Sequence, residues 1–115
     1  MTSEARTEFL TGILCTAAEG GINYWAGVGT YKWDGPAVLR QIQLVEREED
    51  PKDPKGQHTV TLKTIEKGLG LIRAVAPNRQ DLFLADQTDG EDGDFDAADA
   101  DAIVQIALFG ELVYG

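Results

Sequence analysis

The densest group of chemically active side chains is a run of carboxylates near the end of the chain. Six acidic residues and no basic one lie in it: Asp86, Asp89, Glu91, Asp92, Asp94 and Asp96. Carboxylates can hold a divalent cation, and the register that starts at Asp92 comes closest to a calcium-binding loop. That register places Ala97 where the loop needs glycine and Ile103 where it needs a bidentate glutamate. We therefore predict no metal site and interpret the six carboxylates as a partner-binding surface.

The charge of the chain is distributed unevenly. All 10 Lys and Arg residues lie before position 81, together with half of the 20 Asp and Glu residues, so the whole formal charge of −10 comes from residues 81–115. Carboxylates spaced along a surface can imitate nucleic-acid phosphates and attract a basic protein, and that attraction weakens with salt. The pattern favours a basic or nucleic-acid-binding host protein as partner. The alternative is a loop that only keeps the protein soluble.

Direct binding of nucleic acid is disfavoured by the acidic balance, because such proteins neutralise phosphates with Lys and Arg. The residues that would form a local basic patch are Arg40, Arg47, Lys52, Lys55, Lys63 and Lys67.

Four aromatic residues in a short stretch form a second candidate site. They are Tyr24, Trp25, Tyr31 and Trp33. Aromatic walls with a few polar groups are typical of small-ligand pockets, and such rings can also stack nucleobases. The same rings can simply fill the space between a sheet and helices, and we favour that reading of them.

No set of residues predicts catalysis. His58 is the only histidine and Cys15 the only cysteine, so neither a structural zinc site nor a nucleophile–base pair is indicated. Phosphate-binding, dinucleotide-binding and nucleophile-elbow motifs are missing as well. We predict no catalytic residue and no cofactor, and favour a non-enzymatic protein.

Periodicity predicts the elements that must position these residues. Apolar residues at three- and four-residue spacing indicate helices, and runs rich in β-branched and aromatic residues indicate strands. Ser3 or Thr7 can cap the first helix, Thr61 the second, and Asp96 the last, with Asp99 three positions on. The expected elements are a helix at Glu4–Glu19, strands at Ile22–Trp33, Val38–Glu46 and His58–Thr61, and helices at Gln80–Ala85 and Asp96–Phe109. Between the last strand and these, a helix should begin after Thr61, bury Leu62, Ile65, Leu69, Ile72 and Val75, and be ended by Pro77-Asn78.

Finer expectations follow from the same patterns. Regular alternation in the second strand places Val38, Ile42 and Leu44 on one face with Arg40, and Leu39 on the other. Glycines at 68 and 70 would allow close approach of another helix or ring. Leu82 and Phe83 should point inward. The charged segment Arg47–Gln57 should be a mobile surface loop.

The order of elements predicts an α+β fold, in which a small antiparallel sheet packs against helices. The sheet would be a β-hairpin plus a short third strand, in the order α-β-β-(β)-α-α-α. A chain of 115 residues suits one domain, residues 1–115. We expect a cytoplasmic protein with no membrane contact, because neither a signal peptide nor a membrane span is visible. A homo-oligomer is compatible with the sequence.

Three segments resemble small uncharacterised proteins of actinobacteria, their plasmids and their phages. They are Glu19–Trp25, Thr59–Leu62 with Lys67–Leu69, and Asp101–Gln105 with Leu108–Gly115. The resemblance implies an origin in a mobile element and carries no activity, cofactor or site residue.

Two functions from different classes follow. The first is a non-enzymatic acidic protein-binding factor, such as a phage or mobile-element modulator or a nucleic-acid mimic that acts on a host protein. The alternative is a small-ligand-binding protein or enzyme that uses the aromatic pocket.

Overall fold

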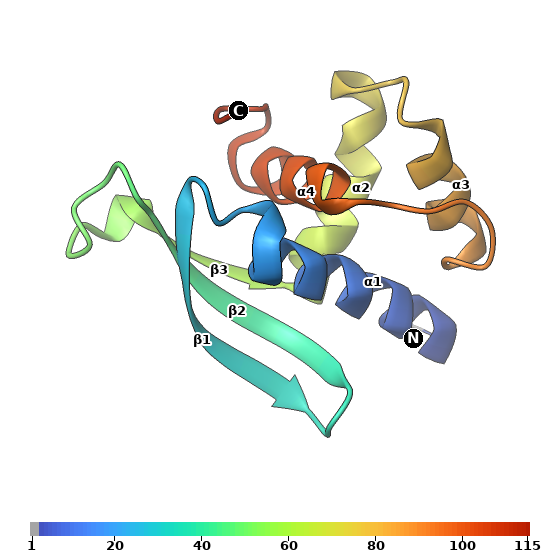
Figure 1. The fold of residues 1–115 in the computed structure, drawn as a ribbon, viewed down its shortest axis with the longest axis horizontal. Coiled ribbons are helices and arrows are strands. Elements are labelled where there is room, and N and C mark those ends of the chain that lie inside the picture. Colours follow the sequence, from blue (N-terminus) through green and yellow to red (C-terminus); the bar gives the residue numbers. More distant parts are fainter. Residues whose placement is uncertain (1–2) are drawn as a thin grey trace.

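The structure, a computed structural model, describes residues 3–115 and has the predicted α+β class (Figure 1). Along the chain, one helix precedes a three-stranded antiparallel sheet and three helices follow it. In space, helices cover the sheet. The helices are α1 (Glu4–Thr16), α2 (Leu62–Val75), α3 (Gln80–Thr88) and α4 (Ala97–Phe109). The strands are β1 (Ala26–Asp34), β2 (Val38–Glu46) and β3 (Gln57–Thr61), in the spatial order β1-β2-β3. The hairpin and the short third strand are therefore confirmed.

Strand β2 lies in the middle of the sheet and has the bounds that the sequence predicts, but its inward face differs from the prediction. Leu39 is buried beside Ile42 and Leu44. Trp33 pairs with Leu39 and Lys32 with Gln41, so β2 carries one extra residue between these pairs. Such a β-bulge shifts the alternation of side chains by one position. Regular alternation through this segment was the wrong assumption.

The first strand begins later than predicted. Ile22–Trp25 forms a turn in which the amides of Trp25 and Ala26 both donate to the carbonyl of Ile22, each at 3.0 Å. Before it, α1 ends at Thr16 and continues as a π-helical turn, Ala17–Gly21. A Cβ on Gly21 would lie 2.8 Å from the carbonyl oxygen of Ala97, so glycine allows α4 to begin against this turn. The turn places Trp25 on α4 rather than in the sheet.

Helix α4 is the central element, as its apolar composition predicts. Ile103, Val104 and Ile106 are fully buried, and α4 packs chiefly against α2. Asp96 caps its first turn and forms a capping box with Asp99. Gly110, with φ of 78°, ends it.

Helix α2 begins at the predicted cap, Thr61, whose hydroxyl accepts from the amide of Thr64. Gly68 fulfils its predicted role, because a Cβ there would overlap the carbonyl oxygen of Ile103. Gly70 does not, since no part of another element within residues 3–115 lies within 4 Å of the position that its Cβ would take. The prediction for Gly70 is wrong.

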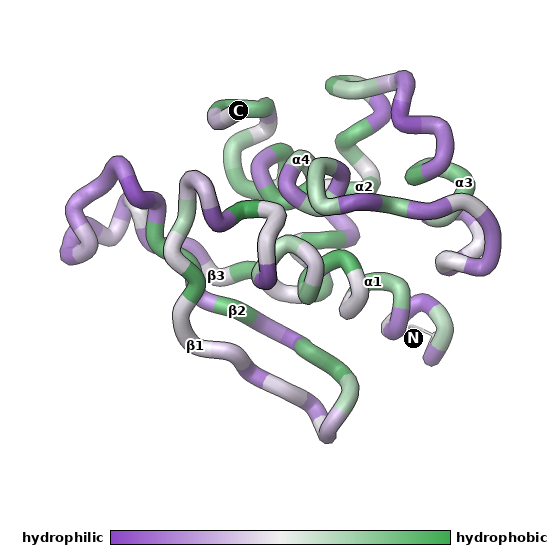
Figure 2. The backbone as a smooth tube through the Cα atoms, viewed as in Figure 1, coloured by the Kyte–Doolittle hydropathy of each residue, from purple (hydrophilic) through white to green (hydrophobic). Residues whose placement is uncertain are grey.

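Helix α3 is longer than predicted and ends at Thr88, after which Asp89 adopts the left-handed conformation. Leu82 and Phe83 point inward as expected. The charged segment after β2 contains a short 3₁₀ turn, Pro54–Gly56, that leads into β3. Figure 2 shows this segment and the loop before α4 as hydrophilic, whereas the backbone where helices and sheet meet is largely hydrophobic. Within residues 3–115, every helix is too short or too polar to span a membrane.

Candidate functional site

The six predicted partner-binding carboxylates divide into two classes once they are placed in the fold. They lie on α3, in the loop after it and at the cap of α4. Some of them are engaged by other groups of the chain, and the rest are exposed. The division decides which of them are available to a partner.

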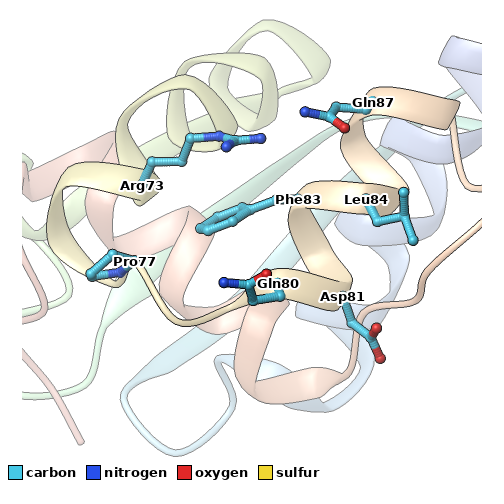
Figure 3. A pocket seen from close by; sticks show the side chains of 7 residues that line it. All are labelled: Arg73, Pro77, Gln80, Asp81, Phe83, Leu84 and Gln87. Carbon is cyan, nitrogen blue, oxygen red and sulfur yellow. The ribbon is translucent and has the colours of Figure 1, made fainter.

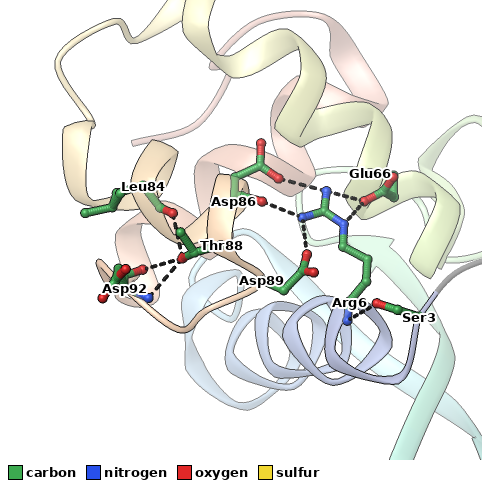
Figure 4. A network of polar contacts seen from close by, with 8 residues as sticks. All are labelled: Ser3, Arg6, Glu66, Leu84, Asp86, Thr88, Asp89 and Asp92. Carbon is green, nitrogen blue, oxygen red and sulfur yellow. Dashed lines mark hydrogen bonds and ion pairs between the residues drawn. The ribbon is translucent and has the colours of Figure 1, made fainter.

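Asp86 and Asp89 are engaged by Arg6, 80 or more residues earlier in the chain (Figure 4). Arg6 Nη2 lies 2.7 Å from Asp86 Oδ1, and Arg6 Nη1 lies 3.2 Å from Asp89 Oδ1. Arg6 Nε also donates to Glu66 Oε1 at 2.7 Å. Burial lowers the pKa of Arg6, but the bonds and charges of Asp86 and Glu66 outweigh it and hold that pKa above its ordinary value. This cluster joins α1, α2 and α3 and uses two of the six carboxylates structurally.

Asp96 serves the fold as well. Its Oδ1 accepts from the amide of Asp99 at 2.8 Å, and the Asp99 carboxylate accepts from the amide of Asp96 at 3.0 Å. Asp99 also pairs with Arg79, at 2.5 Å. A carboxylate in the first turn of a helix is stabilised by the helix dipole. Asp96 is exposed, but its Oδ1 atom is occupied by the capping hydrogen bond.

The other three carboxylates, Glu91, Asp92 and Asp94, are exposed, and so is Asp81 in the first turn of α3. Within residues 3–115, none of these four forms an ion pair. We call these four residues the carboxylate face. A hollow of about 240 Å³ opens between Asp81, Asp94 and Phe95, with the start of α4 as its other wall. The sequence did not single out Asp81, which precedes the acidic run.

Backbone geometry holds the loop of the carboxylate face close to α3. Gly93 has φ of 71°, and a Cβ on it would meet the backbone of Asp81 and Ala85. Thr88 Oγ1 accepts from the amide of Asp92 at 2.9 Å and donates to the carbonyl of Leu84 at the same distance (Figure 4). These contacts do not use the carboxylates of the face; Asp94 Oδ1 does accept from the neighbouring amide of Phe95, at 2.8 Å, but that bond leaves its charge unpaired. Within residues 3–115, no group of three or more His, Cys, Asp or Glu residues is placed to hold a metal ion.

The four aromatic residues predicted to form one group lie in two separate places. Tyr24 and Trp25 meet at Asp101 of α4, to which the Tyr24 hydroxyl donates at 2.6 Å and Trp25 Nε1 at 2.7 Å. Trp25 is buried, whereas Tyr31 and Trp33 are exposed farther along β1. Burial and the Asp101 carboxylate raise the pKa of Tyr24 to about 12. Trp25 thus belongs to the core, and the four rings do not share one set of contacts.

Next to Trp25 lies a polar and aromatic cluster that sequence reasoning missed. The ring of Tyr114 stacks on Trp25, with centroids 5.0 Å apart and planes 7° from parallel. Its hydroxyl donates to Glu46 Oε1 at 2.5 Å, and the other oxygen of Glu46 lies 2.8 Å from His58 Nε2. Gln105, fully buried on α4, accepts from the amides of Val113 and Tyr114 through Oε1, at 2.8 Å each.

The ionisation of this cluster is set by its hydrogen bonds. Burial disfavours the charge on Glu46, but the bonds from Tyr114 and His58 hold the pKa of Glu46 below its ordinary value. The bond to Glu46, together with burial, raises the pKa of Tyr114 to about 12. Glu46 is therefore ionised and Tyr114 neutral at neutral pH. The only sequence signal for the cluster is Gln105, the one polar residue within the run Ala102–Phe109.

A further hollow, of about 500 Å³, lies between the end of α2 and α3 (Figure 3). The guanidinium of Arg73 lies over the ring of Phe83, 4.4 Å from its centroid. Gln80 and Gln87 flank this pair, and Leu84 lies at the rim. Nothing in the sequence analysis indicated this hollow.

The remaining candidates carry little chemistry. Arg40 and Lys63 line one hollow of about 320 Å³, whereas Arg47 Nε donates to the carbonyl of Asn23 and Lys55 pairs with Glu49. Cys15 is half-buried in α1, and burial raises its pKa, which disfavours the reactive thiolate. His58 lies on the edge strand β3, as expected, and within residues 3–115 the side-chain polar contact of its ring is with Glu46.

Comparisons of the chain with protein-family models, with curated proteins and with solved structures return no match. The resemblance to actinobacterial, plasmid and phage proteins remains a prediction.

Proposed function

We propose that this protein is a non-enzymatic binding factor whose carboxylate face docks on a basic protein. The observation that carries the proposal is the set of four exposed carboxylates, Asp81, Glu91, Asp92 and Asp94, that the fold does not neutralise. Residues 81–115 contain no Lys or Arg to neutralise them from nearby in the chain.

Electrostatics supports a macromolecular partner over a small one. Like charges held close together on a surface repel one another, so the free protein bears a cost that a basic partner relieves. The effect extends over about 10 Å at ordinary ionic strength, which is enough to steer a protein or to imitate a row of phosphates. The partner class is therefore a protein with a basic groove, including proteins that bind nucleic acid, and the origin that best suits such a factor is a phage or another mobile element.

The test compares two variants with the same net charge. The first changes the face by Asp81→Asn, Glu91→Gln, Asp92→Asn and Asp94→Asn. The second changes four exposed carboxylates that have no hydrogen bond or ion pair within residues 3–115 and lie outside the face: Glu8, Glu19, Asp34 and Glu48, each to its amide.

Immobilised wild-type protein should capture a basic protein from a host lysate at low salt and release it at high salt. The captured protein is then purified and its affinity for each variant measured. The face variant should bind at least tenfold more weakly than the control variant, because each lost charge contact weakens a salt-dependent complex. Equal affinities for the two variants would refute the face as the docking surface. Competition by duplex DNA for the same partner would identify the protein as a nucleic-acid mimic.

A ligand-binding function is the second candidate, and the hollow between α2 and α3 favours it over the aromatic group. Arg73 offers guanidinium N–H groups for which no hydrogen bond or ion pair is found within residues 3–115, and Phe83 offers an apolar wall. A small carboxylate with an apolar body would match these groups. Titration of benzoate into the protein, followed by the NMR signals of the Gln80 and Gln87 side-chain amides, tests it, and unchanged signals would reject it.

A further inference from the structure

The segment after α4 is held in place by very few of its own side chains. Leu112 and Val113 are 44% and 52% exposed, and only Tyr114 inserts its ring into the body of the protein. We call Glu111–Gly115 the terminal arm. The arm leaves α4 at Gly110, whose φ of 78° allows the chain to turn there. Its attachment therefore depends on the ring and hydroxyl of Tyr114, on two backbone amides and on the carbonyl of Tyr114.

The surface that receives the arm has the features of a peptide-binding site. Trp25 and Phe109 form the aromatic walls around the ring of Tyr114, at centroid distances of 5.0 and 6.1 Å. Glu46, oriented by His58, accepts a hydrogen bond from the phenolic hydroxyl at the end of the slot. We call these residues, together with Gln105, the arm slot.

Gln105 is the part of the arm slot that recognises backbone. It is fully buried, and its two side-chain polar atoms are both used: Oε1 accepts from two successive arm amides, and Nε2 donates to the carbonyl of Tyr114 at 3.2 Å. A side-chain amide that pairs with backbone donors and acceptors does not depend on the identity of the residues it pairs with. Only the ring position carries selectivity, through the stacking and the bond to Glu46.

We propose that the arm slot is a binding site for a short segment of a partner protein that presents a tyrosine in the backbone conformation of the arm, and that the terminal arm occupies this site in the free protein. The ligand is defined by the contacts that the arm itself makes: a tyrosyl ring against Trp25, its hydroxyl on Glu46 and two backbone amides on Gln105. A partner segment must displace the arm before it can bind. The apparent affinity of the slot is therefore its intrinsic affinity multiplied by the fraction of time that the slot is open. This site is separate from the carboxylate face, and either can fail without the other.

The test uses the full chain with the arm disabled. In Tyr114→Ala the ring is removed and the slot is left open, while every slot residue stays. The probe is the neutral peptide acetyl-Leu-Val-Tyr-Gly-amide, which excludes a general charge effect, and binding is followed by tryptophan fluorescence and by the NMR signal of the Trp25 indole N–H. Val113→Pro is a second open variant, because it removes one of the two amides that hold the arm but keeps the Tyr114 side chain.

The peptide should bind both variants at least tenfold more tightly than it binds the wild-type chain. A peptide with phenylalanine in place of tyrosine should bind about tenfold more weakly, since it lacks the hydroxyl that Glu46 accepts. A peptide with alanine there should not bind. Failure of the tyrosine peptide to bind two folded open variants would overturn the proposal. A wild-type dimer that forms with rising concentration and is lost in Tyr114→Ala would assign the slot to the arm of a second copy and would also overturn it.

Discussion

The arm slot and the carboxylate face use the same kind of side chain in opposite ways. In the arm slot, Glu46 is buried and receives hydrogen bonds from two side chains, and in the adjoining cluster Asp101 receives them from three, Tyr24, Trp25 and Gln105. On the carboxylate face, Asp81, Glu91, Asp92 and Asp94 are exposed and form no ion pair within residues 3–115.

This contrast separates the carboxylates that the fold requires from those that it does not. A buried carboxylate without partners is costly, so one that is buried must contribute to the structure through its bonds. An exposed carboxylate without partners contributes little to stability and is free for intermolecular contacts. Sequence alone cannot separate the two classes, since Asp92 and Asp101 have the same side chain only nine positions apart.

The largest effect should come from Asp101→Ala. The change removes the acceptor of Trp25 Nε1, the Tyr24 hydroxyl and Gln105 Nε2, and it leaves a buried indole N–H without a partner. We expect a loss of about 3 kcal/mol in the free energy of unfolding. Urea denaturation measures it, with Asp94→Ala as the matched control that should change stability by less than about 0.5 kcal/mol. Equal losses in both variants would remove the distinction between the two regions.

Alkaline pH should weaken the region around the arm slot next. The pKa values of Tyr24 and Tyr114 are raised to about 12 in the fold, from an ordinary value of 10.0. A raised pKa means that the fold favours the protonated phenol, so its contribution is complete below pH 10 and is lost as pH rises toward about 12. Unfolding free energy measured across this interval should fall more than in the double variant Tyr24→Phe, Tyr114→Phe. Parallel curves for the two proteins would show that neither phenol is coupled to folding.

Tyr114→Phe should have a smaller effect than the change of pH, because it removes one hydroxyl and keeps the stacked ring. Glu46 then keeps only the bond from His58. The expected loss is about 1.5 kcal/mol, with the indole N–H signal of Trp25 unchanged in the NMR spectrum. If this signal moved away from its wild-type chemical shift, the hydroxyl rather than the ring would be what positions the arm.

Arg6→Gln should lower stability by about 1 kcal/mol, since Arg6 is partly exposed and its ion pairs are screened by water. The same change frees Asp86 and Asp89 and enlarges the carboxylate face. Binding of the basic partner should therefore strengthen while the fold weakens. Chemical denaturation and partner titration at one ionic strength check the two results, and a weaker complex would contradict this separation of roles.

Much of the fold could be predicted from local patterns. The bounds of β2, the cap at Thr61 and the box formed by Asp96 and Asp99 depend on residues a few positions apart, and all agree with the structure. The β-bulge in β2 could not be predicted. It leaves one residue of the strand unpaired, and the composition of the strand does not reveal which residue that is.

The polar clusters were beyond such patterns for another reason. Arg6 meets Asp86, and Tyr114 meets Glu46, only because the fold brings together residues that are 80 and 68 positions apart. The sequence therefore indicated where negative charge is concentrated. It could not indicate that Arg6 and the cap of α4 engage three of the six predicted carboxylates, or that Asp81 joins the three that remain.

The proposed function requires that the carboxylate face is not needed for folding and is needed for partner binding. The measurement that tests it most directly is the affinity of the captured basic protein for the variant with Asp81, Glu91, Asp92 and Asp94 changed to amides, beside the variant of equal charge changed at Glu8, Glu19, Asp34 and Glu48. We predict at least tenfold weaker binding by the face variant, with unfolding free energies within about 0.5 kcal/mol of each other. Equal binding by the two variants would contradict the account.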